Sequence, residues 1–184
     1  MIKEAVEFAV EAHKGGVRKG TQIPYIVHPL EAAVIVRSMT GDEELIAAAV
    51  LHDVLEDTDA SEEEVRRQFG NRVADLVVKE TDNKSLSWLE RKTEKLKRVE
   101  AGNRDLKIVV LGDKLSNIRS IARDYLTEGE SLWGRFNDKR KDAHAWYYWN
   151  MADRLKELAE CEPYREYVSL CRQVFGEKKS EWNI

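Results

Sequence analysis

The stretch LIAAAVLHDVLEDT, residues 45–58, decides the fold class of the chain. It opens with the longest apolar run, residues 45–51, which is far shorter than the roughly 20 apolar residues of a membrane-spanning helix. We therefore expect no membrane span, and a helix rich in Ala and Leu over residues 42–55. His52 and Asp53 lie inside this apolar helix, and each needs a partner there because burying an unpaired charge is costly. The simplest interpretation is a core histidine paired with its neighbour.

Glycine, proline and capping residues divide the rest of the chain into further helices. Ser61 with Glu64 and Ser87 with Glu90 form two capping boxes, in which each side chain satisfies a free backbone N–H at a helix start. No run alternates apolar and polar residues with the period of a strand. The sequence predicts an all-α fold of about eight or more helices, and the further helices are expected over residues 2–13, 29–41, 61–70, 71–80, 87–102, 104–126, 137–160 and 163–176.

Length and composition fit one globular domain. The chain has 184 residues, of which 42% are apolar and 35% are charged. A chain of this size can bury a core without disulfides or a structural metal. No linker or internal repeat divides it. We expect a single domain over residues 1–184, with a core over about 1–176 and a loosely held tail over 177–184.

The charge and the cysteines limit the class of partner and the compartment. Thirty Lys and Arg residues against 34 Asp and Glu residues give a net charge of −4, so we expect no nucleic-acid partner, because such surfaces are normally basic. Glu4 and Glu7 lie where an export signal would be apolar. Cys161 and Cys171 lie ten residues apart in one late helical stretch and suggest no disulfide framework. We expect a cytoplasmic protein, and its oligomeric state stays open.

Two further carboxylates follow the His52–Asp53 pair. Glu56 lies four residues after His52, and Asp57 lies four residues after Asp53. Crowded carboxylates repel one another unless a cation lies among them. Imidazole nitrogen together with carboxylate oxygen suits Zn, Mn or Fe. This segment therefore indicates a metal site.

Two more residues could complete a ligand set. His28 precedes Pro29 at the start of a predicted helix, where a lone histidine is more often a cap than a ligand. Asp113 follows apolar residues at positions 106, 109 and 110, so it points from the buried face of its helix and needs a cation or a strong donor. Together His28, His52, Asp53 and Asp113 offer two nitrogen and two oxygen ligands.

The order H…HD…D on an all-α chain resembles the HD-domain metal-dependent phosphohydrolases. The flanking sequence is similar to the hydrolase domain of the RelA/SpoT family over roughly residues 1–155. The similar segments are Arg18-Lys19, PYIVHPL (24–30), LHDVLEDT (51–58), Phe69-Gly70 and GDKLSNIR (112–119). The chain has no room for the synthetase or regulatory domains of the long members, so we expect a stand-alone small alarmone hydrolase.

The resemblance implies a fold, a metal and a reaction. The fold is the helical HD domain, and the metal is one divalent ion, usually Mn²⁺, at the positions of His28, His52, Asp53 and Asp113. The reaction removes the 3′-diphosphate of ppGpp or pppGpp and gives GDP or GTP and pyrophosphate. The implied catalytic acids are Glu56 and Asp57, and the implied nucleotide-binding residues are Arg18, Lys19, Tyr25 and Asn117.

Two segments depart from the family pattern. The loop Gly20–Ile23 is not the commonest form, and Arg140–Trp149 is only loosely similar to the aromatic stretch of the family. That second segment crowds one histidine and four aromatic residues together, and we expect them to serve packing more than binding. They are His144, Trp146, Tyr147, Tyr148 and Trp149.

Other functions stay open at this point. Another HD-domain nucleotide phosphohydrolase, such as a 5′-nucleotidase or a nucleotide pyrophosphatase, would share the four ligands but need not carry Arg18-Lys19 or the Glu56-Asp57 pair. A non-enzymatic nucleotide sensor on the same domain would be expected to lack a ligand or a catalytic acid. The sequence does not rank ppGpp against pppGpp, or against related adenine or NADPH compounds.

Overall fold

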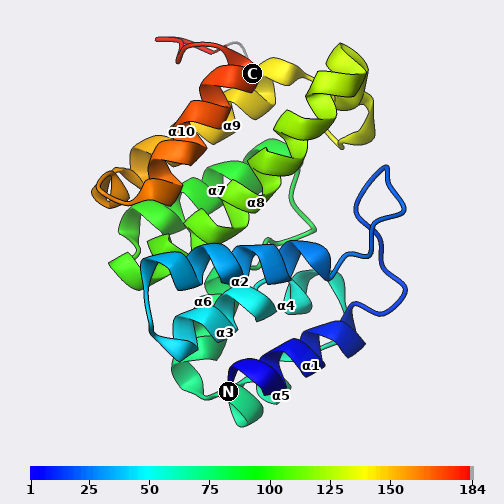
Figure 1. Ribbon diagram of the computed structural model, residues 1–184, viewed down its shortest axis with the longest axis vertical. Coiled ribbons are helices and arrows are strands. Elements are labelled where there is room, and N and C mark those ends of the chain that lie inside the picture. Colours follow the sequence, from blue (N-terminus) through cyan, green and yellow to red (C-terminus); the bar gives the residue numbers. More distant parts are fainter. Residues whose placement is uncertain (183–184) are drawn as a thin grey trace.

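A computed structural model describes residues 1–182, and nearly all of its regular structure is helical (Figure 1). Within these residues there are ten α-helices, two short 3₁₀ helices and no β-strand, although Val17 and Pro24 form an isolated bridge. The all-α prediction is therefore confirmed. The elements are α1 (Ile2–Ala12), α2 (Val27–Met39), α3 (Glu43–Leu51), α4 (Val54–Asp57), α5 (Glu62–Phe69), α6 (Asn71–Glu80), α7 (Trp88–Ala101), α8 (Arg104–Glu128), η1 (Gly129–Arg135), α9 (Lys141–Arg154), η2 (Lys156–Leu158) and α10 (Glu162–Phe175).

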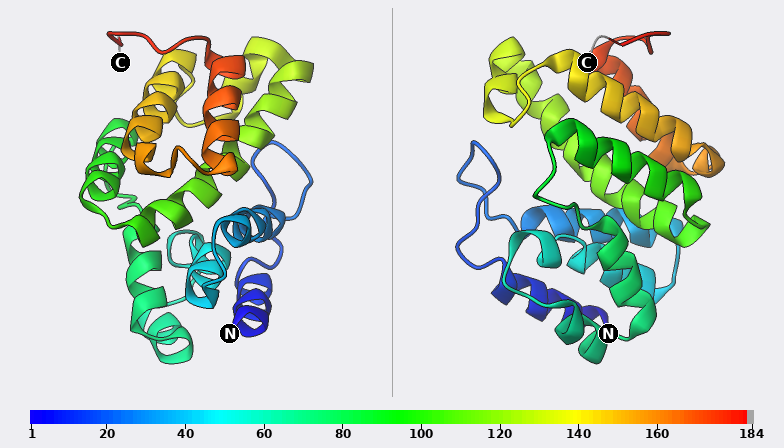
Figure 2. Two further views of the ribbon diagram at one scale, coloured as in Figure 1. Left: turned by 60° about the vertical axis from the view of Figure 1, so that its left-hand side comes forward. Right: turned by 180° about the vertical axis from the view of Figure 1, so that it is seen from behind.

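The long helix α8 connects two groups of helices. The helices α1 to α6 lie in the half of the molecule that holds the N-terminus, and α7, α9 and α10 lie in the other half (Figures 1 and 2). The 25-residue α8 packs against α2, α3 and α10, and it therefore contacts both halves. The predicted site residues of α2, α3 and α8 consequently lie where the two halves meet.

Gly112 lets α8 lie close to α2. A Cβ atom at Gly112 would come within 2.7 Å of Cγ2 of Val36 and 2.9 Å of the carbonyl oxygen of Ala32, and both of these residues are on α2. Any larger residue would push the two helices apart. Gly112 directly precedes Asp113, and His28 lies in the first turn of α2. The close approach of the backbones thus brings these two side chains into reach of each other.

The predicted helix starts agree with the structure at both capping boxes. Ser61 caps α5 and Ser87 caps α7, and in each case the glutamate three residues later bonds back to the cap residue. Such a reciprocal cap satisfies two of the backbone N–H groups that a helix start leaves free. Pro163 lies in the first turn of α10, as expected.

The prediction of one continuous helix over residues 42–55 is wrong in one respect, because the helix is interrupted at His52 and Asp53. The helix α3 ends at Leu51, and the short α4 begins at Val54. The Nδ1 atom of His52 lies 2.7 Å from the carbonyl oxygen of Ala49, which is the acceptor that the backbone N–H of Asp53 would use in a continued helix. The imidazole thus replaces a backbone hydrogen bond, and the chain turns.

The C-terminal half differs from the prediction at two places. The helix expected over 137–160 is shorter, since α9 spans Lys141–Arg154 and the separate η2 follows it. The 3₁₀ helix η1 was not expected. Residues 183 and 184 of the expected tail lie outside the described part of the chain. Within residues 1–182, no helix is both long and apolar enough to cross a membrane.

Candidate active site

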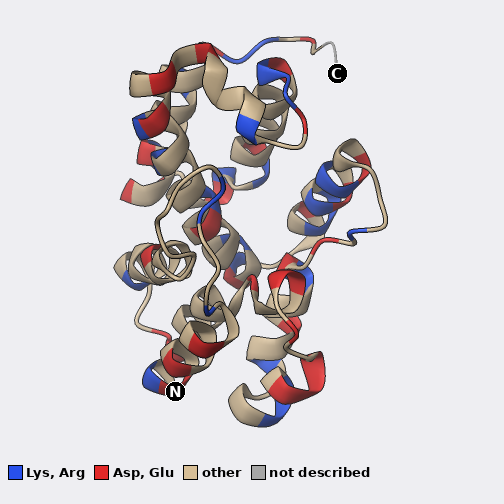
Figure 3. Ribbon diagram, turned by 90° about the vertical axis from the view of Figure 1, so that its right-hand side faces the viewer, with Lys and Arg blue, Asp and Glu red and all other residues tan. Residues whose placement is uncertain are grey.

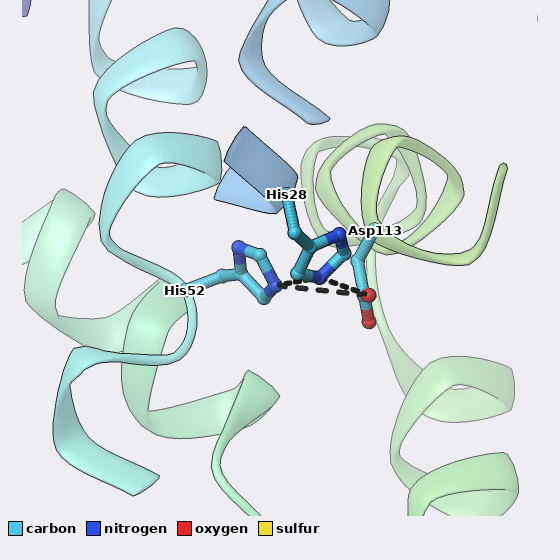
Figure 4. A group of neighbouring side chains, drawn as sticks. All are labelled: His28, His52 and Asp113. Atoms are coloured by element: carbon cyan, nitrogen blue, oxygen red, sulfur yellow. Dashed lines mark hydrogen bonds and ion pairs between the residues drawn. The ribbon is translucent and has the colours of Figure 1, made fainter. Parts of the chain in front are cut away.

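Three buried side chains from three elements converge at the junction of α2, α3 and α8 (Figure 4). They are His28 in the first turn of α2, His52 after the end of α3, and Asp113 in the middle of α8. Each offers one ligand atom, and these atoms lie within 4.8 Å of one another. The two Nε2 atoms are 3.2 Å apart. The Oδ1 atom of Asp113 lies 3.3 Å from Nε2 of His28 and 3.6 Å from Nε2 of His52.

Asp53 lies beside this group as a candidate fourth ligand. Its Oδ2 atom lies 3.0 Å from Nε2 of His52 and 3.5 Å from Nε2 of His28. Metal–ligand bonds of about 2.0–2.2 Å place neighbouring ligand atoms on one ion roughly 3.0–3.5 Å apart. The separations in this cluster have that size, and nitrogen with carboxylate oxygen is a suitable set for a divalent transition metal. His28, His52 and Asp113 therefore fit one divalent ion, and Asp53 lies beside the two histidines as a candidate fourth ligand.

Both histidines are oriented by hydrogen bonds at their outer nitrogen. Nδ1 of His52 bonds to the carbonyl oxygen of Ala49, and Nδ1 of His28 lies 2.8 Å from Oγ of Ser116. A carbonyl oxygen can only accept, so Nδ1 of His52 carries a proton, and in the neutral imidazole Nε2 presents a lone pair to the cluster. Such contacts to the second ring nitrogen are the usual way in which proteins orient a metal-binding histidine.

Strong electrostatic coupling holds the two aspartates ionised. Burial opposes ionisation of both carboxyl groups, but His52 and His28 beside Asp53 outweigh it and hold the pKa of that carboxyl well below its usual range. Lys114 has the same effect on the pKa of Asp113, since its Nζ atom lies 2.5 Å from Oδ2. Burial also lowers the pKa of His52, yet Asp53 and Asp113 outweigh burial and raise it to about 9. The cluster thus attracts positive charge.

The two predicted catalytic acids line the same cavity of about 160 Å³ as three of the four candidate ligand residues. Oε2 of Glu56 accepts a hydrogen bond from the backbone N–H of Asp82 at 2.9 Å. Burial, with Asp82 nearby, raises the pKa of Glu56. Asp57 accepts a hydrogen bond from Nζ of Lys84 at 2.8 Å, and its Oδ2 atom lies 3.2 Å from the hydroxyl oxygen of Tyr25. The structure therefore brings both acids to the cluster, although the helix between them and His52 is broken.

Hydrogen bonds join three of the predicted nucleotide-binding residues to the cluster. Arg18 donates to Oδ1 of Asn117 at 2.9 Å, and Nδ2 of Asn117 donates to Oδ1 of Asp113 at 2.5 Å. The hydroxyl of Tyr25 donates to Oδ2 of Asp53 at 2.5 Å. These bonds link the loop before α2 to the candidate metal ligands.

Lys19 lies further out than the other three. Its Nζ atom donates to Oδ1 of Asn137 at 2.7 Å, across the opening between that loop and the segment before α9. All four predicted nucleotide-binding residues line cavities next to the cluster.

Two further cavities adjoin the cluster and differ in chemistry. The larger, of about 300 Å³, combines Arg18 and Arg135 with apolar and aromatic side chains such as Leu132 and Phe136. The smaller, of about 230 Å³, is lined by four cations, and within the described residues 1–182 none of its lining residues is a carboxylate. These cations are Lys19, Arg91, Lys92 and Lys114. Figure 3 shows the run of basic residues along α7 that supplies two of them.

The aromatic stretch before η2 serves packing, but it also reaches this second cavity. Tyr147, Tyr148 and Trp149 are buried in the core, as expected. Tyr147 also lines the cationic cavity, and its ring centroid lies 5.2 Å from Nζ of Lys92 and 5.7 Å from Nζ of Lys114. Its hydroxyl is buried without a hydrogen-bond partner in the described structure. The expectation that this stretch serves packing more than binding agrees with the burial of these rings, and Tyr147 is the residue through which it also borders the cavity.

Sequence reasoning missed Lys92 and Lys114 as site residues. Lys114 directly follows Asp113, and a buried carboxylate beside a lysine was a signal that could have identified it. Lys92 carries no comparable signal, because it reaches the cluster only through the packing of α7 against α8 and α9.

Comparisons with known proteins agree with this geometry. The sequence model of the HD domain matches residues 5–141 of the chain. A protein of Xenopus tropicalis named guanosine-3′,5′-bis(diphosphate) 3′-pyrophosphohydrolase MESH1 is 40% identical over 126 residues, which are 67% of this chain and 70% of that protein. A protein of Aquifex aeolicus (strain VF5) named guanosine-3′,5′-bis(diphosphate) 3′-pyrophosphohydrolase is 31% identical over 198 residues. That match covers 96% of this chain but spans only 27% of the Aquifex protein.

Two solved structures are similar in fold over most of the chain. A crystal structure of a protein from Listeria monocytogenes EGD-e has a TM-score of 0.74 and 34% identity, and the match covers 82% of this chain and 99% of the other. A structure described as a metazoan ortholog of SpoT that hydrolyses ppGpp has a TM-score of 0.77 and 29% identity, and the match covers 94% of both chains.

Proposed function

The chain belongs to the HD domain family, and from that premise we propose that it is a guanosine-3′,5′-bis(diphosphate) 3′-pyrophosphohydrolase. It removes the 3′-diphosphate of ppGpp or pppGpp and gives GDP or GTP and pyrophosphate. The names of the Xenopus and Aquifex relatives support this activity. The structural observation that carries it is the hydrogen-bonded path from Arg18 through Asn117 to Asp113, since it couples a nucleotide-binding loop to a cluster fit for a metal.

We assign the metal to His28, His52, Asp53 and Asp113, and we propose Mn²⁺ as the ion. Two imidazoles and two carboxylates suit Mn²⁺ as well as the other first-row metals, so the choice rests on the resemblance to the RelA/SpoT hydrolases. When bound, such an ion lowers the pKa of a water molecule and neutralises phosphate charge.

Glu56 and Asp57 provide the proton transfers of the proposed reaction. Water attacks the phosphorus that carries the 3′-oxygen, the bond from phosphorus to this oxygen breaks, and the 3′-oxygen takes up a proton. Burial raises the pKa of Glu56 and so favours its protonated form, and we propose it as the acid that donates a proton to the leaving oxygen. Asp57, oriented by Lys84 and Tyr25, is the group that accepts the proton of the attacking water.

The two outer cavities fit the two ends of the nucleotide. The cavity of about 230 Å³ has four cations and suits the phosphates that leave as pyrophosphate, because Lys and Arg form strong charge-assisted bonds to phosphate oxygens. The cavity of about 300 Å³ is lined by apolar and aromatic groups with a few polar ones and suits the nucleoside. We propose that the nucleotide spans both and that its 3′-phosphorus lies at the metal cluster between them.

The alternatives receive less support. A sensor that has lost a ligand or an acid is disfavoured, since His28, His52, Asp53, Asp113, Glu56 and Asp57 all lie at the cluster. We also propose a small nucleotide partner rather than a nucleic acid, in keeping with the net charge of −4, and a cytoplasmic location, in keeping with two cysteines that form no disulfide.

Product identification tests the proposed function. The Mn²⁺-loaded protein is incubated with ppGpp, and the products are separated by anion-exchange chromatography, with GTP and GDP as parallel substrates. GDP and pyrophosphate from ppGpp, with little turnover of GTP, are expected. Inorganic phosphate released from the 5′ side, or equal activity on GTP, would assign the protein to another class of nucleotide phosphohydrolase.

A further inference from the structure

A buried serine connects the candidate ligand His28 to a glutamate outside the metal cluster. Oγ of Ser116 donates a hydrogen bond to Oε2 of Glu31 at 2.8 Å and lies 2.8 Å from Nδ1 of His28. Ser116 is fully buried, and His28 is 3% exposed. Ser116 lies three residues after Asp113 on α8, and Glu31 lies three residues after His28 on α2. One helical turn thus separates Ser116 and Glu31 each from a candidate ligand on the same helix. We call the path from Glu31 through Ser116 to His28 the relay.

The number of protons available between Glu31, Ser116 and His28 determines the tautomer of His28. A serine hydroxyl has one proton, whereas an ionised carboxylate can only accept. When the Ser116 hydroxyl donates its hydrogen bond to Glu31, the serine oxygen can only accept a hydrogen bond from Nδ1 of His28. The imidazole proton then lies on Nδ1, and the lone pair of Nε2 points toward Asp113 and His52.

The opposite arrangement would remove His28 as a ligand. If Ser116 donated to Nδ1 instead, the imidazole proton would lie on Nε2 and would point into the cluster in place of a lone pair. The negative charge of Glu31 disfavours this arrangement, because it attracts the serine proton. The carboxylate also polarises the Nδ1–H bond through the serine and makes Nε2 a stronger ligand.

Glu31 is itself held from the far side by Arg119. Nη1 of Arg119 lies 3.1 Å from Oε1 of Glu31, while its Nε and Nη2 atoms form two bonds to Glu166 of α10 at 2.7 and 2.6 Å. The bidentate pair with Glu166 fixes the guanidinium plane. The carboxylate of Glu31 therefore keeps one oxygen on Arg119 and the other on Ser116.

We infer that Glu31 and Ser116 are positioning residues that set the tautomer and the ligand strength of His28, and so the affinity of the cluster for its divalent ion. The inference rests on the metal site of the proposed function but not on its substrate. Partners of this kind that bond to a metal-binding histidine typically contribute about 10–100-fold to metal affinity. Glu31 also lines the cavity of about 300 Å³ that we assign to the nucleoside, so the metal titration that tests its positioning role is made without nucleotide.

Metal titration without substrate tests the relay. Mn²⁺ binding to the metal-free protein is measured by calorimetry for the wild type, Ser116→Ala, Glu31→Gln and the double variant. Ser116→Ala is expected to raise the Kd for Mn²⁺ by about 10–100-fold, and Glu31→Gln is expected to raise it less. The double variant is expected to match Ser116→Ala alone, because residues that act through one path are not additive.

Two control variants separate the relay from a merely structural effect. Glu166→Gln breaks the other ion pair of Arg119 but leaves Ser116 untouched, and Ser38→Ala removes a hydroxyl of α2 that bonds to the carbonyl of Ile35, away from the cluster. Both should keep the wild-type Kd for Mn²⁺. A loss in Glu166→Gln equal to that in Glu31→Gln, or additive losses in the double variant, would overturn the relay.

A spectroscopic readout follows the proton itself. In the Zn²⁺-loaded protein, which is diamagnetic, ¹⁵N chemical shifts distinguish a protonated Nδ1 from a metal-bound Nε2 on His28. The wild type should show that pattern, and Ser116→Ala should shift the Nδ1 resonance of His28 while leaving that of His52 unchanged. Unaltered His28 shifts would contradict the inference, whereas an inactive protein with wild-type metal binding would contradict the proposed function alone.

Discussion

The Nε2 atoms of His28 and His52 face each other at 3.2 Å, although neither imidazole has its other nitrogen available to the cluster. Nδ1 of His52 is bonded to Ala49, and Nδ1 of His28 is bonded to Ser116. Two nitrogen lone pairs at this distance repel unless a positive charge lies between or beside them. A proton on His52 or a divalent ion can supply that charge, so the two compete for one place.

Affinity for the divalent ion should therefore rise with pH. Burial lowers the pKa of His52, but Asp53 and Asp113 outweigh burial and raise it to about 9. The metal-free protein thus holds a proton there at neutral pH and must release it when the ion binds. The Kd for Mn²⁺ should fall by up to about tenfold for each pH unit between about pH 6.5 and 8.5. Calorimetric titration at three pH values checks this, and a Kd that stays constant over that range contradicts it.

Metal-free protein should lose stability as the pH rises. A histidine whose pKa is raised on folding contributes stability that is fully present below its unfolded pKa of about 6.5 and is lost as the pH rises through its folded value. For His52 that folded value is about 9, and the contribution is at most about 3 kcal/mol. Urea unfolding of the metal-free protein at about pH 6.5, 7.5 and 9 measures it. A stability that increases over this window would show that His52 is neutral in the folded protein.

Removal of either aspartate should abolish metal binding, with different effects on stability. Asp53→Ala and Asp113→Ala each delete a charged ligand, so elemental analysis should find little bound metal and turnover should cease. Asp113→Ala also leaves Lys114 buried without its partner, which destabilises a protein by about 3–5 kcal/mol. Asp113→Asn keeps the shape and serves as the second variant if the alanine protein fails to fold. Asp59→Ala, an exposed aspartate beyond α4, is the control, and full occupancy in the Asp53 and Asp113 variants would refute the assignment.

Substitution of Glu56 or Asp57 should lower kcat and leave the metal content of the protein unchanged. Glu56→Gln and Asp57→Asn leave the four ligand residues in place, so both variants should bind Mn²⁺ like the wild type. General acid and base groups typically contribute about 10²–10⁴-fold, and kcat should fall by that factor in each. The roles given to Glu56 and Asp57 are wrong if both variants keep nearly the wild-type kcat.

Three of the four candidate ligands carry local signals of burial in the sequence, whereas His28 was identified only with the resemblance to the RelA/SpoT family. His52 and Asp53 follow seven apolar residues, and Asp113 lies on the apolar face of its helix, so the local pattern indicates that each needs a partner, which the carboxylates Glu56 and Asp57 suggest is a cation. The break after Leu51 was not predictable from these patterns. It depends on a side-chain bond from His52 to Ala49, and helix propensity alone favours continuation.

The residues that surround the cluster were harder to predict, since they meet only in the folded protein. Lys92 of α7, Lys114 of α8 and Tyr147 of α9 line one cavity although they are far apart in the sequence. Glu31 and Ser116 are ordinary polar residues of two helices until α2 and α8 pack together through Gly112. Local patterns report which face of a helix is buried, but not which polar groups of other helices it meets.

The cationic cavity provides the last test, and it centres on Lys92. This lysine lines both the metal cavity and the cavity of about 230 Å³, and its Nζ atom lies 3.0 Å from Oδ2 of Asp82. Asp82 keeps a second partner, since Nη2 of Arg98 lies 3.0 Å from its Oδ1. Lys92→Met should therefore remove a positive charge from the cavity proposed to hold the leaving phosphates without leaving Asp82 unpaired.

Catalytic efficiency, and not metal binding, should respond to this change. A hydrogen bond to a charged group contributes about 1.5–3 kcal/mol, so kcat/KM for ppGpp should fall by roughly 10–100-fold in Lys92→Met, while the Kd for Mn²⁺ stays at the wild-type value. Inhibition by added pyrophosphate should weaken by a similar factor, because the same cation would hold the product. Lys97→Met changes an exposed lysine of the same helix and is the matched control. Equal kcat/KM values for the two variants would place the leaving phosphates outside this cavity.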